Sequence, residues 1–545
     1  MDSASSAPTS AVKSASRTPD PDNSGQSEAM YDWSNVKDGP NGGIDDDVLK
    51  MALEPLPKTY SKGLHAEKIL RLGIFDQTML RKDIPLIFCF SMPDQRKETL
   101  RLATEVLRYG LQVALQRWPF LAGKLHEENE ENSSRKNLLE LRYTDPPADV
   151  VQSGVFHAQT VSSLRTFQEL SDMGMPPSAL DGFLLTGRVQ SSSLDLSLPV
   201  LKVQANFIEG GLLLAFAFAH PVLDGVSLQH FFDHFSHCTR QMPVDEGKPS
   251  AIRAHVLSPN GPLAATTPAE IHPRILPTFQ SPLPPSPPAD LCPEFNPTPA
   301  PTRPLDNGPP TARIFTFPAQ LITNLKTAIT AHIHAHHLPG WISTHDALSA
   351  LLWTAIARAR APHLPPHTRF CCTANARPAL ALPPAYIGNA VAYALATLPA
   401  ATLTTPPSVL HTPTLAAAAL AIRAALVAAT TPAYLRARLA RLAAAPDVAA
   451  APVALAAAVG MGCAGVFLTS WVAFGADAVW GVPGVGEGER RARWVRKPWC
   501  ASEGCVNVLP RREGAGVWEV LVGLAEGEMG VLVGVLGEVA AGVVE

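Results

Sequence analysis

The chain reads Ala-His-Pro-Val-Leu-Asp-Gly at residues 219–225, and this stretch decides the fold. An alternating apolar run at 200–207 and a continuous one at 212–219 lead into it, separated by Glu209-Gly210-Gly211. This pattern predicts a β-hairpin whose second strand is buried and ends at His220. An imidazole placed there can act as a general base.

Spacing alone leaves two interpretations of this stretch open. The chain has 17 histidines, so about one His-x-x-x-Asp match is expected by chance. His220 is either a core histidine hydrogen-bonded to Asp224, or a catalytic base at the end of its strand. Gly225 permits a sharp exit or a close backbone approach that a side chain would block.

Length and composition exclude several classes of protein. A chain of 545 residues exceeds one ordinary core and predicts two substantial domains. The net charge of −4 argues against a nucleic-acid binder, which carries a strong basic bias. The short basic cluster at 490–497 is interpreted as a surface loop, with contact to the phosphates of an anionic cofactor as the alternative. Eight cysteines without a paired spacing indicate a reduced, intracellular protein, expected in the cytoplasm.

Shifts in composition divide the chain into four ranges. Residues 1–47 are expected to form a disordered tail without a targeting signal. Residues 48–241 and 312–545 mix helix and strand patterns and are expected to be two α/β domains. Residues 242–311 are crowded with proline, which disfavours helices and central strands, so a crossover linker is expected.

Local patterns predict the main elements of both domains. They indicate helices at 97–116, 319–332 and from a cap at Ser343 or Thr344 through Arg358, and strands at 312–317, 507–509 and 517–524. The charge-free segment 448–476 is long enough to span a bilayer. It is rich in alanine and interrupted by proline and glycine, so a buried helix followed by a buried strand is expected instead.

Further short motifs follow one another along the chain. They are Trp-Pro-Phe-Leu-Ala-Gly-Lys at 118–124, Ser-Thr-His-Asp-Ala-Leu-Ser-Ala-Leu-Leu-Trp at 343–353, Asn-Ala-Arg at 375–377, Tyr-Ile-Gly-Asn at 386–389, Thr-Ser-Trp at 469–471, Asp-Ala-Val-Trp-Gly at 477–481 and Val-Leu-Pro-Arg-Arg at 508–512. Together with His220-x-x-x-Asp224-Gly225, this ordered set resembles the BAHD acyltransferase family, nearer its fungal branch of trichothecene 3-O-acetyltransferase-like enzymes. The resemblance runs from about residue 56 to residue 532.

The resemblance implies a fold and a reaction. The fold is α/β, with two similar chloramphenicol-acetyltransferase-like domains, each a mixed sheet flanked by helices, and a channel between them. An acyl-CoA, by default acetyl-CoA, is the co-substrate, no cofactor is bound permanently, and a small-molecule alcohol or amine, by default a secondary-metabolite hydroxyl, is the acceptor. Transfer is direct, without a covalent acyl-enzyme. A monomer with no membrane or nucleic-acid partner is expected.

The resemblance also implies roles for particular residues. His220 removes the proton of the acceptor. Asp224 pairs with Arg377, and both, with Gly225, support the histidine loop. Thr469 and Trp471 are expected on the oxyanion or acceptor side, as donors of an O–H and an indole N–H; an ordinary buried strand is the alternative.

A third group, Asp477, Trp480 and Gly481, is expected to shape the channel and the cofactor side. The Asp-Phe-Gly-Trp-Gly of the family is Asp-Ala-Val-Trp-Gly in this chain. This departure puts cofactor affinity in question more than the chemistry.

Two other functions compete with the acyltransferase. The altered motif at 477–481 is compatible with a catalytically impaired, acyltransferase-like protein that only binds a ligand. His332 and His336 have the i, i+4 spacing of two metal ligands on one helix. Because no third ligand has a recognisable spacing, an exposed helix end is expected there and no metal site.

Overall fold

The computed structural model describes residues 66–128, 135–188, 194–244, 250–258, 307–486, 490–498, 502–537 and 539–544, together with Leu53, Asn260, Cys292 and Gly488. The expected tail at 1–47 and most of the expected linker lie outside the described residues.

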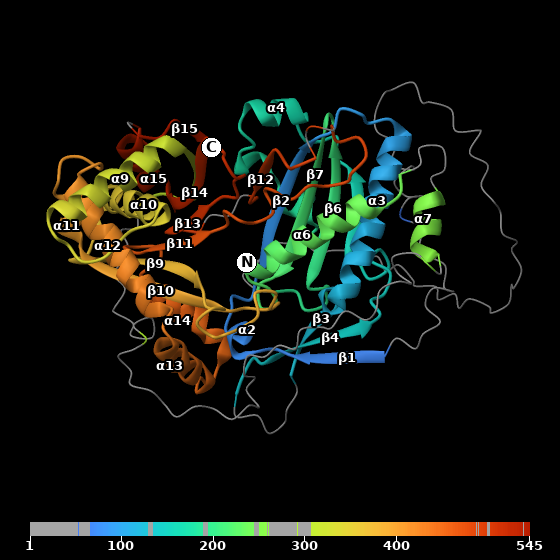
Figure 1. Ribbon diagram of the computed structural model, residues 1–545, viewed down its shortest axis with the longest axis horizontal. Helices are drawn as coiled ribbons and strands as arrows, with labels where there is room; N and C mark the ends of the chain where they lie inside the picture. The colour runs from blue at the N-terminus through green and yellow to red at the C-terminus, as the bar shows by residue number, and fades with distance from the viewer. Residues whose placement is uncertain are drawn as a thin grey trace, which may run out of the picture. The chain divides into compact units, whose positions relative to one another are not determined.

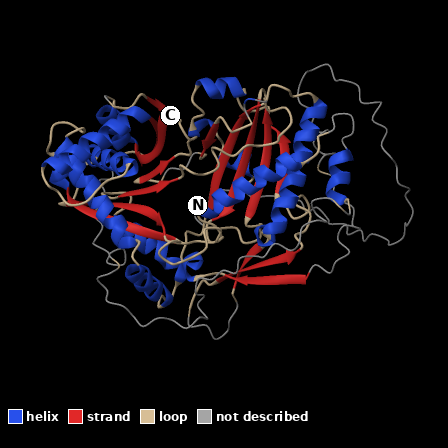
Figure 2. Ribbon diagram, viewed as in Figure 1, coloured by secondary structure: helices blue, strands red, loops and turns tan. Residues whose placement is uncertain are grey.

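The described strands form three sheets, visible as separate groups in Figure 2. The five-stranded sheet consists, in spatial order, of β12 (Trp494–Arg496), β2 (Asp83–Ser91), β7 (Gly211–Ala219), β6 (Leu201–Ile208) and β5 (Phe156–Thr160). The seven-stranded sheet consists of β10 (Val391–Pro399), β9 (His367–Asn375), β11 (Val466–Ser470), β13 (Cys505–Val508), β14 (Val517–Ala525), β8 (Pro310–Pro318) and β15 (Gly542–Val544). The three-stranded sheet consists of β1 (Ala66–Arg71), β4 (Leu139–Asp145) and β3 (Lys124–Glu127).

The predicted hairpin is confirmed as β6 and β7. The two strands pair antiparallel from Ile208 opposite Gly211 to Leu201 opposite Phe218. All nine residues of β7 are buried. The N–H of His220 then donates to the carbonyl of Lys82 at 2.9 Å, so the histidine stands at the end of this strand beside β2.

Two long helices cover one face of the five-stranded sheet, α3 (Lys97–Arg117) and α6 (Gly225–Gln241) (Figure 1). An aromatic cluster fills the space below α6: the ring of Phe216 lies 5.1 Å from that of Phe232, and the ring of Phe218 lies 5.5 Å from that of Phe231. This packing fixes where α6 begins and therefore where the loop from His220 to Gly225 can run.

Helices of the second half gather around the seven-stranded sheet (Figure 1). They are α9 (Ala319–Ala335), α10 (Thr344–Ala359), α11 (Ala400–Thr404), α12 (Thr412–Ala429), α13 (Pro432–Ala443), α14 (Ala451–Val459) and α15 (Glu526–Leu536). Of the two predicted caps of α10, Ser343 and Thr344, the structure has Ser343, whose hydroxyl accepts the N–H of Asp346 at 3.2 Å. The shorter helices α2 (Ile74–Gln77), α4 (Phe167–Asp172) and α5 (Gly182–Thr186) belong to the first half.

One stretch of the second half belongs to the core of the first. Trp471, Phe474 and Trp480 pack in the hydrophobic cluster of α3 and α6, and β12 pairs antiparallel with β2. The expected linker, residues 242–311, also contains a helix: α7 (Ser250–Leu257) packs through Ile252 and Val256 against α3. The simple division at 242–311 therefore does not describe how the sheets are assembled.

The charge-free segment contains a helix, α14, and then a strand, β11, in the predicted order. The expectation that the helix is buried was wrong: only Ala458 and Val459 are buried, and Val453 is 69% exposed. The helix borders a cavity and solvent instead of the core. Among the described helices, α12 is long and apolar enough to cross a membrane by length and composition. Here it packs against α10 and β10.

Candidate active site

A cavity of about 1640 Å³ is lined by residues of both larger sheets. The first half contributes the start of β2, the loop from His220 to Gly225 and the region of α5. The second half contributes the ends of β9 and β10, the length of β11 and the residues that follow it, and α14. Five of the predicted site residues therefore line one cavity: His220, Asp224, Gly225, Thr469 and Trp471.

His220 lies deep in the protein but keeps part of its surface on the cavity. Its Nδ1 is buried and lies near the backbone of His220 and Leu223. Nε2 is therefore the ring nitrogen that the cavity can reach. Burial lowers the pKa of His220 below its usual value of 6.5, and the nearby backbone and the Asp224 carboxylate oppose this shift only in part. The imidazole is thus neutral at pH 7, as a general base requires.

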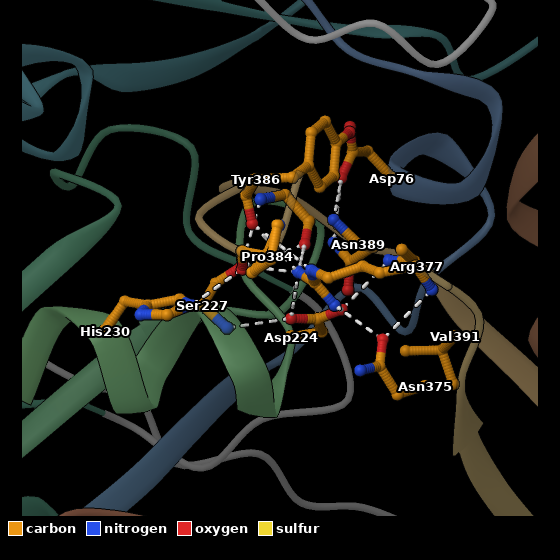
Figure 3. A network of polar contacts seen from close by, with 12 residues as sticks. Asp76, Asp224, Ser227, His230, Asn375, Arg377, Pro384, Tyr386, Asn389 and Val391 are labelled. Carbon is orange, nitrogen blue, oxygen red and sulfur yellow. Dashed lines mark hydrogen bonds and ion pairs between the residues drawn. The ribbon is translucent and has the colours of Figure 1, made fainter. Parts of the chain in front are cut away.

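The predicted pair of Asp224 and Arg377 is present and doubly hydrogen-bonded (Figure 3). Nη1 of Arg377 donates to Oδ2 at 2.8 Å, and Nη2 donates to Oδ1 at 2.9 Å. Both side chains are almost fully buried. Asp224 also caps α6, since Oδ1 accepts the N–H of Ser227 at 3.0 Å. Both oxygens of the Asp224 carboxylate thus accept hydrogen bonds, which argues against a role of Asp224 in proton transfer.

Three successive N–H groups of the second half donate to side chains of the first (Figure 3). Gly388 donates to the Ser227 hydroxyl at 3.0 Å, Asn389 to Asp76 at 2.8 Å, and Ala390 to Asp224 at 2.9 Å. A buried backbone donor needs a partner, so these three contacts fix the segment firmly against the histidine loop.

Asn389 connects this segment to His220 itself. Its Nδ2 donates both to Oδ1 of Asp76 at 2.9 Å and to the backbone carbonyl of His220 at 3.0 Å. Sequence reasoning missed Asp76, which is fully buried and lies in α2, a stretch without a recognisable motif. Asn389 was in a quoted motif but had been assigned no role.

Gly225 is required by a close approach. A Cβ built on Gly225 would lie 2.2 Å from Cζ of Phe474, far inside van der Waals contact. The Phe474 ring in turn lies almost parallel to that of Trp471, with the centroids 5.6 Å apart. The expectation of a close backbone approach at Gly225 is confirmed, and the partner comes from the other half of the chain.

The opposite wall of the cavity is the seven-stranded sheet. Thr469 and Trp471 both line the cavity. The Thr469 hydroxyl accepts from Thr373 at 3.5 Å, which leaves its own proton available to the cavity. Trp471 is 6% exposed.

Asp477, Trp480 and Gly481 are not among the residues that line the cavity. Trp480 is fully buried, with its ring 5.1 Å from that of Phe235. A Cβ on Gly481 would lie 2.7 Å from the backbone of α6. Asp477 accepts the N–H of Glu513 at 3.2 Å. Trp480 and Gly481 pack against α6 and so anchor the crossing stretch onto the first core, whereas Asp477 is exposed. The expected place of the three residues on the channel and cofactor side stays a prediction.

The metal alternative finds no support in the described part of the chain. No group of three or more His, Cys, Asp or Glu side chains there is arranged to hold a metal ion. His332 and His336 lie at the C-terminal end of α9, with their ring centroids 4.0 Å apart and the ring planes tilted by 36°.

Comparison with known proteins completes the description. The model of the Transferase family matches residues 61–534, most of the chain. The chain belongs to the Transferase family. The resemblance to BAHD acyltransferases found in the motifs is thereby confirmed, and with it the assignment of the chain as an acyltransferase.

Two curated relatives of this family are fungal acetyltransferases. Eremophilane O-acetyltransferase ORF8 of Penicillium roqueforti is 28% identical over 348 residues, which cover 57% of this chain and 67% of the relative. Trichothecene 3-O-acetyltransferase TRI101 of Fusarium sporotrichioides is 24% identical over 317 residues, which cover 56% and 62%.

Solved structures confirm the α/β fold. TRI101 of F. graminearum, in complex with coenzyme A and T-2 mycotoxin, has a TM-score of 0.67 at 20% identity and matches 88% of this chain and 100% of its own. Vinorine synthase has a TM-score of 0.53 at 18% identity, covering 90% and 96%. These solved structures, although distant in sequence, thus share with this chain the arrangement of mixed sheets flanked by helices.

Proposed function

We propose that this chain transfers an acetyl group from acetyl-CoA to a hydroxyl group of a small secondary metabolite, with His220 as the general base. The observation that carries the proposal is the position of His220: a neutral imidazole on the wall of a large cavity, facing a sheet that bears donors. Relatives named O-acetyltransferases support the acetyl donor and the hydroxyl acceptor. The proposal includes a monomeric, cytoplasmic enzyme without a permanently bound cofactor.

The reaction proceeds in two steps on this geometry. Nε2 of His220 takes the proton of the acceptor hydroxyl while its oxygen attacks the thioester carbonyl carbon, and the π electron pair moves to the carbonyl oxygen. The tetrahedral oxyanion then collapses, the C–S bond breaks, and the CoA thiolate leaves with the proton that the imidazolium returns. A positioned base of this kind contributes about 10²–10⁴ in rate.

Thr469 and Trp471 are proposed to face the reacting carbonyl and the acceptor. Their O–H and indole N–H are donors of the type that stabilises an oxyanion. Asp224 and Arg377 act through the histidine loop and take no part in proton transfer, because their polar atoms are already bonded to each other.

The test uses the full chain with acetyl-CoA and a panel of hydroxyl-bearing terpenoids and polyketides. We expect at least one alcohol to gain one acetyl group by mass spectrometry, with release of an equal amount of free CoA. Binding of acetyl-CoA without any acetylated product over the whole panel would favour the alternative, an acyltransferase-like protein that only binds its ligand.

A further inference from the structure

A row of polar side chains crosses the cavity wall on the seven-stranded sheet and ends in an ammonium group. Thr373, Thr469 and Asn507 occupy adjacent positions on β9, β11 and β13: Thr469 is paired in register with Asn507, and Thr373 donates to Thr469 at 3.5 Å. Nζ of Lys497 donates to Oδ1 of Asn507 at 3.3 Å. All four residues line the cavity.

Lys497 has no carboxylate partner among the described residues. Its contacts are the neutral amide of Asn507 and the ring of Trp471, whose centroid is 5.5 Å from Nζ. The neighbouring cation is different, because Arg496 forms an ion pair with Glu519 at 2.7 Å. The half-buried ammonium of Lys497, beside an amide and an aromatic ring, can therefore donate to an anionic group of a ligand in the cavity.

The contacts of Trp471 connect this row to the histidine loop. Trp471 stacks with Phe474, and Phe474 contacts Gly225 closely, five residues after His220. Trp471 follows Thr469 by two residues along an extended chain, a rise of about 7 Å. Lys497, Trp471, Phe474 and Gly225 thus form a continuous series of contacts, and Lys497 and His220 line the same cavity.

We propose that Lys497 and Asn507 bind the oxygen of the reacting thioester carbonyl and stabilise the negative charge that develops on it. This inference rests on the acetyl transfer proposed above and adds two donors to it. When the acceptor oxygen bonds to the carbonyl carbon, the π pair moves to the carbonyl oxygen, which accepts from Nζ of Lys497 and from Nδ2 of Asn507. When the C–S bond breaks, the pair returns and both donors are released. Because Lys497 holds Oδ1 of Asn507, the N–H groups of that amide remain for the ligand.

The experiment compares Lys497→Met, Lys497→Arg and Asn507→Ala with wild type. Lys326→Met, on α9 and away from the cavity lining, is the matched control. We expect kcat for acetyl transfer to fall about 10²-fold in Lys497→Met, because loss of one oxyanion donor has an effect of that order. Lys497→Arg should recover part of the loss, and KM for acetyl-CoA should not change in any variant.

A binding measurement gives a second readout that does not need turnover. S-carboxymethyl-CoA carries a fixed negative charge one carbon beyond the carbonyl position at which acetyl-CoA develops one, and S-ethyl-CoA carries no charge there. By calorimetry, Lys497→Met should bind S-carboxymethyl-CoA more weakly by about tenfold or more, the effect of one hydrogen bond to a charged group, and should bind S-ethyl-CoA as wild type does.

The outcomes separate this inference from the proposed function. Equal weakening of both analogues in Lys497→Met would place Lys497 on a CoA phosphate and overturn the inference, as would unchanged binding of both. Wild type could transfer no acetyl group while Lys497→Met still weakens binding of S-carboxymethyl-CoA but not of S-ethyl-CoA. In that case the proposed acetyl transfer is wrong, and the assignment of Lys497 to an anion site holds. Should Lys497→Met fail to fold, the same comparison is made with Lys497→Arg and Asn507→Ala.

Discussion

Arg377 holds Asp224 in a two-point ion pair, with Nη1–Oδ2 at 2.8 Å and Nη2–Oδ1 at 2.9 Å, across 153 residues of chain. Nη2 also donates to the carbonyls of Tyr386 and Gly388. One guanidinium therefore joins the loop after β7 to the loop before β10. His220, the candidate base, lies in the first of these loops but does not contact the Arg377 guanidinium through its side chain.

Loss of this pair should lower stability strongly. We expect Arg377→Met to reduce the free energy of unfolding by about 3–5 kcal/mol, because it leaves the buried Asp224 carboxylate without its partner. The control, Arg96→Ala, removes the exposed partner of Asp94 and should change the free energy of unfolding by only about 0–1 kcal/mol. Urea unfolding followed by circular dichroism measures both, and an effect of Arg377→Met no larger than that of Arg96→Ala would contradict the account.

The pH dependence of activity should report His220. Because burial lowers the pKa of His220 below 6.5, the base is lost only when the pH falls below that value. We expect kcat/KM to be level around pH 7 and to decline at acid pH, with a midpoint below 6.5. A midpoint above 6.5 would mean that the Asp224 charge outweighs burial and that the imidazolium is favoured.

A methyl group at position 225 should disturb the close contact between the histidine loop and Phe474. In Gly225→Ala the Cβ would meet the Phe474 ring, and overpacking of this kind costs about 1–3 kcal/mol. We expect lower stability and lower kcat/KM, partly restored by adding Phe474→Leu. Gly530→Ala on α15, where a Cβ meets nothing within 4 Å, serves as the control and should be neutral or stabilising. Full activity of Gly225→Ala would show that Phe474 is free to move.

Asn389 should affect catalysis through the carbonyl of His220. Asn389→Ala removes both Nδ2 hydrogen bonds, so the Asp76 carboxylate and the His220 carbonyl each lose a donor. This should lower the free energy of unfolding by about 1–3 kcal/mol. We expect kcat to fall while KM for acetyl-CoA stays constant, since Asn389 does not line the cavity. Asn324→Ala, on the exposed side of α9, is the matched control. Steady-state kinetics that show a change in KM alone would argue against a positioning role.

The sequence predicted the parts of the fold that local patterns determine. Alternation and the turn at Glu209-Gly210-Gly211 predicted the β6–β7 hairpin. A cap at Ser343 or Thr344, with Asp346 in the first turn, predicted the start of α10. The pairing of Asp224 with Arg377 came from the resemblance to a family, because nothing in the spacing of two residues so far apart indicates contact.

The sequence did not predict contacts that depend on how distant segments meet. The packing of residues 471–486 and 490–496 in the first core has no local signature, since an apolar strand is compatible with either sheet. Asp76 has no motif around it, and its role appears only when Asn389 is placed beside it. Asp477, Trp480 and Gly481 were expected at the channel because of the resemblance to the family. The buried ring of Trp480 and the close approach of Gly481 to α6 depend on tertiary packing, which the motif does not reveal.

The most direct test of the central claim is the rate of CoA release by His220→Ala from acetyl-CoA and an accepted alcohol, relative to wild type. Calorimetry with CoA and an unfolding curve establish that the variant is folded and binds its donor. We predict a rate lower by about 10²–10⁴ with unchanged CoA binding. A His220→Ala enzyme that works at the wild-type rate would contradict the assignment of His220 as the base.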